Sequence, residues 1–517
     1  MQQLTRTVVR NSAFGLGAQL AIKLLSFAFS VLIVRHLGAD AFGQYAAVLA
    51  FGAVFVFVGD LGLSPYTVRA VARWRDAPGG AENTNALYGN VLVLRLLLSL
   101  LAASLVVGTA VLTERPPAMV GAIALGTLGL MMYGVQGTSA ALLAGFERLD
   151  LSAGAGVLNQ LTFVLAGGLM LWLGFGYYGL IVANLLGVAA MTCVCWRGVW
   201  MLGARPRRPA TDVWPGLLKA SLPFGVIGLA LGLSYRFDSV LLNVYRGDAE
   251  SGYYNAAYNL VFSTVVISNV LNTSLYPSLT RQVANNPAPP PELYERPLRY
   301  LMALSLPIAV GAWVLADRLV PFLFTASYLP AVPVLQIVIW AVPLMFASEY
   351  LGYVVVIRGD EARVARAVVI SAGLNAALNL ALVPRYGFFA AAVMTVATEA
   401  VLVAQYLWLL RATVRSFDWS RALLRPLLAA VVMGVLLTTL PNLSVPAAVS
   451  LGAVFYGGLL LVLGVVGREE YRFARSLHVG KVRGPLPEPA RGGGPEAVVG
   501  AERHVAGGVG AERSAGR

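Results

Sequence analysis

Long apolar segments separated by short polar breaks dominate the chain from residue 11 to residue 467. A helix needs about 20 apolar residues to cross the ~30 Å hydrocarbon core of a bilayer. Segments long enough to cross run over residues 11–34, 43–65, 86–112, 118–144, 151–175, 177–203, 215–245, 252–280, 297–325, 331–357, 364–384, 387–410, 422–441 and 447–467. The pattern therefore predicts an all-α integral membrane protein with 14 transmembrane helices.

The same segments indicate an internal repeat of six helices. The matching pairs, at offsets of 209 to 211 residues, are Phe14-Gly15 with Phe224-Gly225, residues 43–47 with 252–256, and residues 175–179 with 386–390. Because six is even, the two halves enter the membrane with the same orientation, as in transporters whose parallel lobes enclose the substrate. We expect two parallel six-helix lobes around a central cavity, followed by a helix pair and a disordered cytoplasmic tail. The expected boundaries are 1–210, 211–411, 412–467 and 468–517.

Composition and charge agree with a membrane protein. Only 12% of the residues are charged and 58% are hydrophobic, whereas a soluble domain has about 25% charged residues. The net charge of +13 does not indicate a nucleic-acid partner. With the N-terminus inside, 30 of the 38 Lys and Arg residues fall on inward-facing segments, 4 fall on outward loops and 4 fall within helices. The positive-inside rule then predicts that both termini are cytoplasmic, in a plasma or inner membrane.

The sequence offers no sign of an enzyme, a metal site or a cofactor. Cys193 and Cys195 lie in an apolar run without a neighbouring His, which indicates neither a disulfide nor a zinc site. No phosphate-binding glycine loop is present, so the chain has no ATP-driven motor of its own. The longest loop expected, about 20 residues around Arg69–Asn85, is too short for a soluble domain.

Several motifs resemble a known transporter family. They are residues 11–15 (NSAFG), 29–38 (FSVLIVRHLG), 42–45 (FGQY), 59–63 (GDLGL), 235–238 (YRFD), 252–254 (GYY) and 386–387 (YG). These motifs resemble the polysaccharide-transporter (Wzx-type) flippases of the multidrug/oligosaccharidyl-lipid/polysaccharide superfamily, over roughly residues 10–410.

The resemblance implies two six-helix lobes facing a central cavity and a substrate made of an oligosaccharide on undecaprenyl pyrophosphate. A monomer is expected, with polysaccharide polymerase or ligase machinery as partners. Relatives that move the peptidoglycan precursor carry a cavity arginine where this chain has Asn255, Tyr258 and Asn259, which argues against that precursor as substrate.

Basic residues inside the predicted helices are candidates for binding the pyrophosphate. Lys23 lies at the middle of the first helix, on one face with Gln19, Ser26 and Ser30. Arg236 lies in the seventh, and its planar fork suits a phosphate. A charge at that depth costs about 2.5–3.5 kcal/mol when unpaired, so each must face water, an anion or a carboxylate. For Lys23 and for Arg236, the sequence allows either of two roles: binding the substrate or forming a structural ion pair with a carboxylate.

Neutral polar residues could bind the sugar. Asn255 and Asn259 in the eighth helix and Asn375 in the eleventh could bond sugar hydroxyls, and the Tyr258 ring could stack on a sugar face. The alternative is that such residues tie helices together.

Intramembrane carboxylates have two expected roles. Asp60 and Arg95, on neighbouring helices at similar depth, are expected to form a structural ion pair. Glu349 and Glu399 have no obvious partner in the sequence, and they are the candidates if H⁺ or Na⁺ drives transport. The alternative is that they pair with Lys23 or Arg236.

Together these features favour a flippase that moves undecaprenyl-pyrophosphate-linked oligosaccharide from the cytoplasmic to the outer leaflet by alternating access, for export of cell-surface polysaccharide. A cation-coupled multidrug exporter of the same superfamily should have an acidic cavity, whereas the first and seventh helices here carry bases. A membrane enzyme acting on polyprenyl-linked sugars should have a sizeable outward loop that carries its catalytic residues. The outward loops of this sequence are too small for that.

Overall fold

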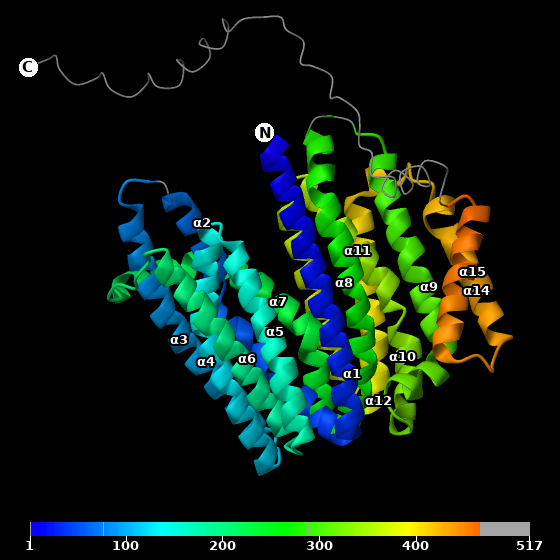
Figure 1. Ribbon diagram of the computed structural model, residues 1–517, viewed down its shortest axis with the longest axis horizontal. Helices are drawn as coiled ribbons and strands as arrows, with labels where there is room; N and C mark the ends of the chain where they lie inside the picture. Colours follow the sequence, from blue (N-terminus) through cyan, green and yellow to red (C-terminus); the bar gives the residue numbers. More distant parts are fainter. Residues whose placement is uncertain (1, 76, 285, 287–288, 466–517) are drawn as a thin grey trace, which may run out of the picture. The chain divides into compact units, whose positions relative to one another are not determined.

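The computed structural model describes residues 2–75, 77–284, 286 and 289–465, and within them the side chains of residues 2–21, 23 and 24 are among those left outside. This part of the chain is helical and contains no strand (Figure 1). The expected disordered tail, 468–517, lies outside the described residues.

The first half of the chain forms α1 (Gln2–Asp60), α2 (Leu63–Trp74), α3 (Gly80–Leu112), α4 (Pro117–Gly145), α5 (Leu149–Trp172) and α6 (Gly176–Met201). The second half forms α7 (Trp214–Arg246), α8 (Asp248–Ala284), α9 (Glu292–Leu323), α10 (Val332–Val338), α11 (Ala341–Ile357) and α12 (Glu361–Leu409). The chain ends in α13 (Arg411–Val414), α14 (Arg425–Thr438) and α15 (Val445–Val462). The prediction of an all-α membrane protein is confirmed.

Every one of the fourteen predicted apolar segments lies largely on a helix, although the structure divides them differently. In the described part of the chain, nine helices are long and apolar enough to cross a membrane, or ten if α10 and α11 form one bent span. α1 and α12 each contain two predicted segments, whereas α7 and α8 are not among the nine. The predicted number of fourteen spans therefore stays a prediction. The loop expected around Arg69–Asn85 is shorter in the structure, because the end of α2 and the start of α3 occupy most of it.

Glycines in the left-handed region break the helices at matching places. Gly38 interrupts α1 with φ 74° and ψ 176°, and Gly247 between α7 and α8 has nearly the same angles, φ 88° and ψ −176°. Gly176 (φ 56°) begins α6, and Gly387 (φ 58°) interrupts α12. A side chain is strained at positive φ, so glycine is the residue that fits such breaks. Their spacing of 209 and 211 residues supports the internal repeat.

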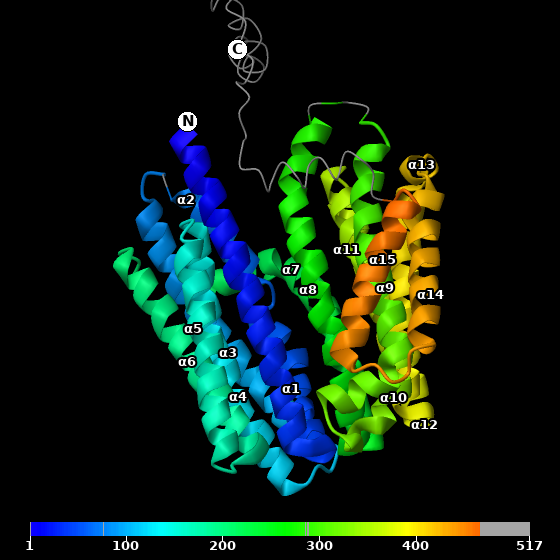
Figure 2. The same cartoon turned by 45° about the vertical axis from the view of Figure 1, so that its right-hand side comes forward.

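Helices from the first half pack together, and so do those from the second. α3, α5 and α6 gather with α4 on one side in Figure 2, and α9, α11, α12 and α14 on the other. α1 contacts both groups because it packs against α3 and α4 and also against α7 and α8. Residues 1–465 form one unit by their contacts, so the lobe boundaries stay a prediction.

Arginine side chains donate hydrogen bonds to backbone carbonyl oxygens at the carboxyl ends of three helices. Arg35 donates from Nε to the carbonyl oxygens of Leu323 (2.7 Å) and Phe324 (3.1 Å) at the end of α9. Arg318 donates to carbonyl oxygens just beyond α14, including that of Pro441 at 3.0 Å, and Arg425 to that of Leu463 beyond α15 at 2.9 Å. The last carbonyls of a helix lack partners within it and carry partial negative charge, so a guanidinium stabilises them. These contacts tie α1 to α9 and the terminal helix pair to the rest.

α1 and α8 cross in direct backbone contact near the Gly38 break. A Cβ atom at Gly43 would lie 1.8 Å from the carbonyl oxygen of Asp248, and one at Gly252 would lie 2.2 Å from that of Ala39. Only two residues without side chains allow this approach. Gln44 also donates to the Asp248 carboxylate at 3.0 Å. In the nearby loop, burial lowers the pKa of Arg115, and attraction to Asp248 opposes that shift.

We predict that Gly43→Ala destabilises the protein by about 1–3 kcal/mol, because the new methyl group must push the backbone of α8 away. Thermal unfolding in detergent measures the effect. Gly52→Ala is the matched control on the same helix, since its Cβ would meet nothing within 4 Å, and alanine there should be neutral or stabilising by up to about 1 kcal/mol. Equal melting temperatures for the two variants would contradict the tight crossing.

Candidate functional site

A cavity of about 170 Å³ lies where α1 meets α5, α7 and α8, and we call it the interlobe cavity. Its polar lining combines residues predicted from the sequence with others that were not, namely Ser26, Ser30, Tyr45, Gln160, Arg236, Asn255 and Asn259. It is smaller than the ~300–1,000 Å³ of a typical ligand pocket, so it has room for a headgroup fragment such as a phosphate rather than for a whole glycan.

Arg236 brings a positive charge to this cavity from α7. Its side chain is half-buried, and no carboxylate forms an ion pair with it among the residues that the structure describes. Asp238, two positions along the same helix, is 2% exposed. Residues two apart lie on different faces of a helix. Arg236 thus faces the cavity while Asp238 is bonded elsewhere, as described below.

The α1 side of the cavity is partly described. Ser26 and Ser30 both line it, and the Ser26 hydroxyl donates to the carbonyl oxygen of Ile22 at 2.8 Å. The side chains of Gln19 and Lys23 lie outside the described residues. Since Lys23 shares a helix face with Ser26 and Ser30, its part in the cavity stays a prediction.

The two asparagines on α8 differ in what they can offer. Asn255 is 1% exposed, donates to the carbonyl oxygen of Ser251 at 2.8 Å and accepts from the Ser239 hydroxyl at 3.1 Å. Its amide is therefore already bonded between helices, as intramembrane asparagines commonly are. Asn259 also lines the cavity, and within the described part of the chain its side-chain amide has no such bond.

Sequence reasoning overlooked Gln160 on α5 and Tyr45 on α1. Gln160 is polar in an otherwise apolar span, a signal that could have marked it. Tyr45 is 6% exposed and lies beside the cavity, but a tyrosine in a membrane helix is not by itself informative.

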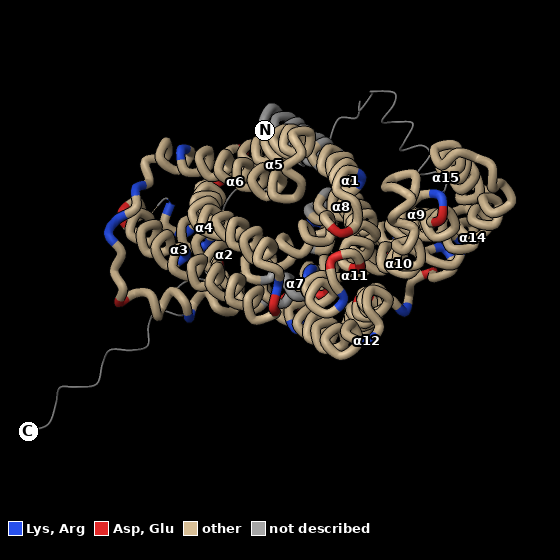
Figure 3. The backbone as a smooth tube through the Cα atoms, turned by 90° about the horizontal axis from the view of Figure 1, so that it is seen from below, with Lys and Arg blue, Asp and Glu red and all other residues tan. Residues whose placement is uncertain are grey.

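A second cavity, of about 470 Å³, lies among α8, α11 and α12, and we call it the acidic cavity. Glu349, Glu399, Tyr258 and Asn375 all line it. Figure 3 shows the backbones of α8, α11 and α12, the helices that line this cavity, close together. Tyr258 and Asn375, which were predicted to contact the sugar, thus lie with the candidate coupling residues rather than with Arg236.

Neither glutamate in the acidic cavity pairs with Arg236. Glu349 accepts from the Asn269 amide at 2.8 Å, and its other carboxylate oxygen is buried without a partner in the described part of the chain. Glu399 accepts a short hydrogen bond from Ser348. Asn375 donates to the Thr398 hydroxyl at 3.0 Å and accepts from Asn379 at 3.1 Å. The cavity therefore combines two carboxylates, neutral hydrogen-bonding groups and an apolar wall.

The ion pair between Asp60 and Arg95 is present, with 2.7 Å between Arg95 Nη2 and Asp60 Oδ1. Ser64 joins it, since its hydroxyl donates to Asp60 at 2.8 Å and accepts from Arg95 Nη1 at 2.9 Å. The pair connects the end of α1 to α3 beside α2 and lines neither of the two cavities described above. The expected structural role of this pair stays a prediction.

The family model described as polysaccharide biosynthesis protein matches residues 8–283, more than half of the chain. The chain belongs to this family. The match confirms the resemblance drawn from the sequence motifs, and with it a transporter rather than an enzyme.

Individual relatives agree with this assignment. The chain is 22% identical over 391 residues to the probable low-salt glycan biosynthesis flippase Agl15 of Haloferax volcanii, covering 74% of this chain and 80% of that protein. Among solved structures, the lipid II flippase MurJ in an inward closed conformation has a TM-score of 0.74 at 14% identity, covering 90% of this chain and 100% of that one. An inward-facing multidrug resistance MATE family transporter has a TM-score of 0.57 at 13% identity, covering 76% and 96%. The predicted superfamily fold is thereby confirmed.

We predict that Arg95→Leu destabilises the folded protein by about 3 kcal/mol, because it leaves Asp60 without its partner in a mostly buried place. Arg207→Leu is the control, since Arg207 and Glu82 form a pair whose side chains are 55% and 64% exposed, and such pairs contribute about 0–1 kcal/mol. Chemical unfolding in detergent compares the two. If both variants lost the same free energy of unfolding, a structural role for the buried pair would be contradicted.

Proposed function

We propose that this protein is a flippase that carries undecaprenyl-pyrophosphate-linked oligosaccharide from the cytoplasmic to the outer leaflet of the plasma membrane. The observation that carries the proposal is an arginine that forms no ion pair among the described residues and lines a cavity to which helices of both halves contribute. A guanidinium so placed offers two parallel hydrogen bonds to a phosphate. Lys23 is proposed as the second cation, on the strength of its place in the sequence.

The sugar-phosphate headgroup explains why a protein is needed. Its charges and hydroxyls would enter hydrocarbon without hydrogen-bond partners, at several kcal/mol or more. The polyprenyl tail can stay in the bilayer while the headgroup crosses beside Arg236, Asn259 and Gln160. The names of the relatives, a glycan biosynthesis flippase and a lipid II flippase, support a lipid-linked glycan as the substrate class.

The peptidoglycan precursor itself is a weaker candidate. Asn255, Tyr258 and Asn259 occupy the stretch of α8 where the resemblance implies a basic residue for that substrate. Asn255 is committed to bonds within the protein, and Tyr258 lines the acidic cavity. We therefore place the substrate among the oligosaccharides used for surface polysaccharides.

The distribution of Lys and Arg supports cytoplasmic termini. In that orientation, the Gly43–Gly252 crossing and the Arg35 contacts close the outer end of the structure. Alternating access then requires these contacts between α1 and the second half to separate before the headgroup can leave on the outer side.

We further propose that a cation drives transport through the acidic cavity. Glu349 and Glu399 are the residues that could load and release a proton or hold a sodium ion. Because these carboxylates lie away from the interlobe cavity, the binding of the driving ion and of the anionic headgroup need not compete for one place. The acidic cavity is a feature that an exporter of cationic drugs would also have, whereas the arginine of the interlobe cavity favours an anionic headgroup.

We predict that Arg236→Ala slows leaflet exchange of a fluorescent undecaprenyl-pyrophosphate oligosaccharide in proteoliposomes about tenfold or more, because hydrogen bonds to a charged partner contribute about 1.5–3 kcal/mol. Arg236→Lys should recover part of the rate, since the charge remains without the fork. Lys219→Ala, which removes an exposed charge from the same helix, serves as control. Unchanged exchange in Arg236→Ala would remove the ligand assignment, and absence of exchange in the native protein would refute the function.

For Glu399→Gln, we expect leaflet exchange to lose its dependence on an imposed H⁺ or Na⁺ gradient, because the amide cannot exchange a proton or supply a charge to a cation. Exchange down the gradient of the glycolipid itself should continue. The measurement compares proteoliposomes with H⁺, Na⁺ or no gradient. A variant that responds to gradients as the native protein does would exclude Glu399 as the coupling residue.

A further inference from the structure

Buried polar side chains connect the two cavities through the helices that separate them. At one end, Asn255 lines the interlobe cavity and accepts from the Ser239 hydroxyl at 3.1 Å. The backbone N–H of Ser239 donates to Asp238 Oδ1 at 2.7 Å. The Tyr254 hydroxyl donates to the other oxygen of Asp238. Asp238 is 2% exposed, so these bonds are what keep a carboxylate tolerable at this place.

The connection continues into the acidic cavity. The oxygen atoms of Tyr254 and Thr395 are 3.1 Å apart, and either hydroxyl could donate. Thr395 lines the acidic cavity and also donates to the carbonyl oxygen of Ala391 at 2.9 Å. A hydroxyl has a single hydrogen to donate, so while Tyr254 donates to Asp238, Thr395 can donate either to the Tyr254 oxygen or to the Ala391 carbonyl, but not to both at once. The connection therefore contains an element with two arrangements.

Helix geometry places the functional residues at the two ends. Arg236 and Asp238 are two apart on α7, so one face presents the cation to the interlobe cavity while the other enters the hydrogen-bonded chain. Thr395 and Glu399 are four apart on α12 and share a face. A shift or rotation of α7 that moves Arg236 must also move Asp238 relative to Tyr254 and Thr395.

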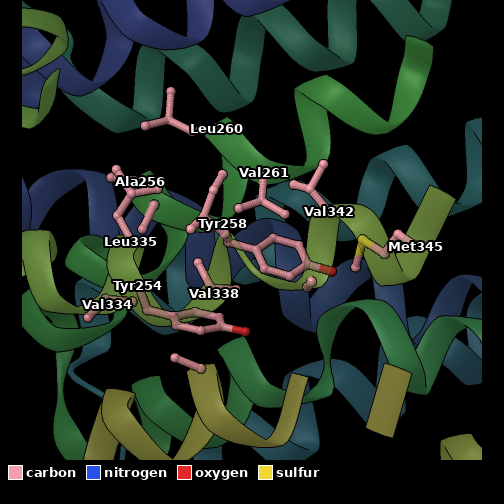
Figure 4. Close-up of a cluster of buried hydrophobic side chains, with 14 of the residues drawn as sticks. Tyr254, Ala256, Tyr258, Leu260, Val261, Val334, Leu335, Val338, Val342 and Met345 are labelled. Carbon is pink, nitrogen blue, oxygen red and sulfur yellow. The ribbon is translucent and has the colours of Figure 1, made fainter. Parts of the chain in front are cut away.

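The Tyr254 ring is held in place by its neighbours. It stacks on Tyr258 with 5.6 Å between ring centroids and 26° between planes, and Figure 4 shows both hydroxyls pointing the same way. Because Tyr254 is fully buried, its hydroxyl has little freedom to seek other partners.

We propose that the chain Asp238–Tyr254–Thr395 transmits the state of the acidic cavity to the interlobe cavity, with Tyr254 as the positioning residue. This inference rests on the proposed flippase function and adds the route by which the driving cation and the headgroup influence one another. Such an influence is a coupling free energy, and it acts equally in both directions.

A double-mutant cycle tests the route by equilibrium binding of a fluorescent undecaprenyl-pyrophosphate oligosaccharide to the purified full chain. The Glu399→Gln substitution is introduced into three backgrounds: the native protein, the Tyr254→Phe variant and the Tyr350→Phe variant. Tyr350→Phe is the matched control, because it removes a buried hydroxyl that is not part of the Asp238–Tyr254–Thr395 connection and that donates to the Tyr294 carbonyl oxygen at 2.7 Å. We expect Glu399→Gln to change the affinity about fivefold or more in the native and Tyr350→Phe backgrounds. In the Tyr254→Phe background the change should fall below about twofold.

An equal effect of Glu399→Gln in all three backgrounds would overturn the route, and so would no effect in the native protein. Thr395→Val interrupts the next bond along the chain and must give the same result as Tyr254→Phe; it replaces Tyr254→Phe if that variant does not fold. Failure of the native protein to bind the lipid at all would instead refute the proposed function itself, which separates the two conclusions.

Discussion

A charge in a low-dielectric interior must have a partner, and this constraint accounts for much of the arrangement described above. Arg95 is paired with Asp60, and Asp238 is surrounded by hydroxyl and N–H donors. Arg35 and its counterparts bind the carbonyls at helix ends. Once these partners are assigned, Arg236 stands out among the described residues as a half-buried cation that lines an interhelical cavity without forming an ion pair. This arrangement supports the proposal of an anionic ligand.

The cavity that contains Arg236 and the cavity that contains the two glutamates are separate, and α8 lines both of them. α8 contributes Asn255 and Asn259 to one cavity and Tyr258 to the other, so its two faces meet different environments. The many polar residues of α8 lower its hydropathy, which explains why this 37-residue helix is not among those apolar enough to cross a membrane by length and composition.

The sequence predicted the helices well because apolar length and glycine breaks are local properties. The repeat motifs also indicated matching helix breaks, which Gly38 and Gly247 provide through nearly equal backbone angles. Neighbours across helices were harder to predict. Spacing places Asn375 on a face of its helix but does not say which helix that face meets, and it lies with Glu399 rather than Arg236. Residues 69–74 of the amphipathic α2 were expected in a loop, because a 12-residue helix is too short to be predicted as a membrane span.

The contact between Arg35 and α9 depends on residue identity on one side only. Its partners are backbone carbonyl oxygens of residues 322–324, which every amino acid possesses. Substitutions that preserve the end of α9 can therefore change the acceptor's identity without changing its chemistry, whereas few replacements for the donor could span the same oxygens. The contact between α1 and α9 should thus tolerate many substitutions at residues 322–324 and very few at Arg35.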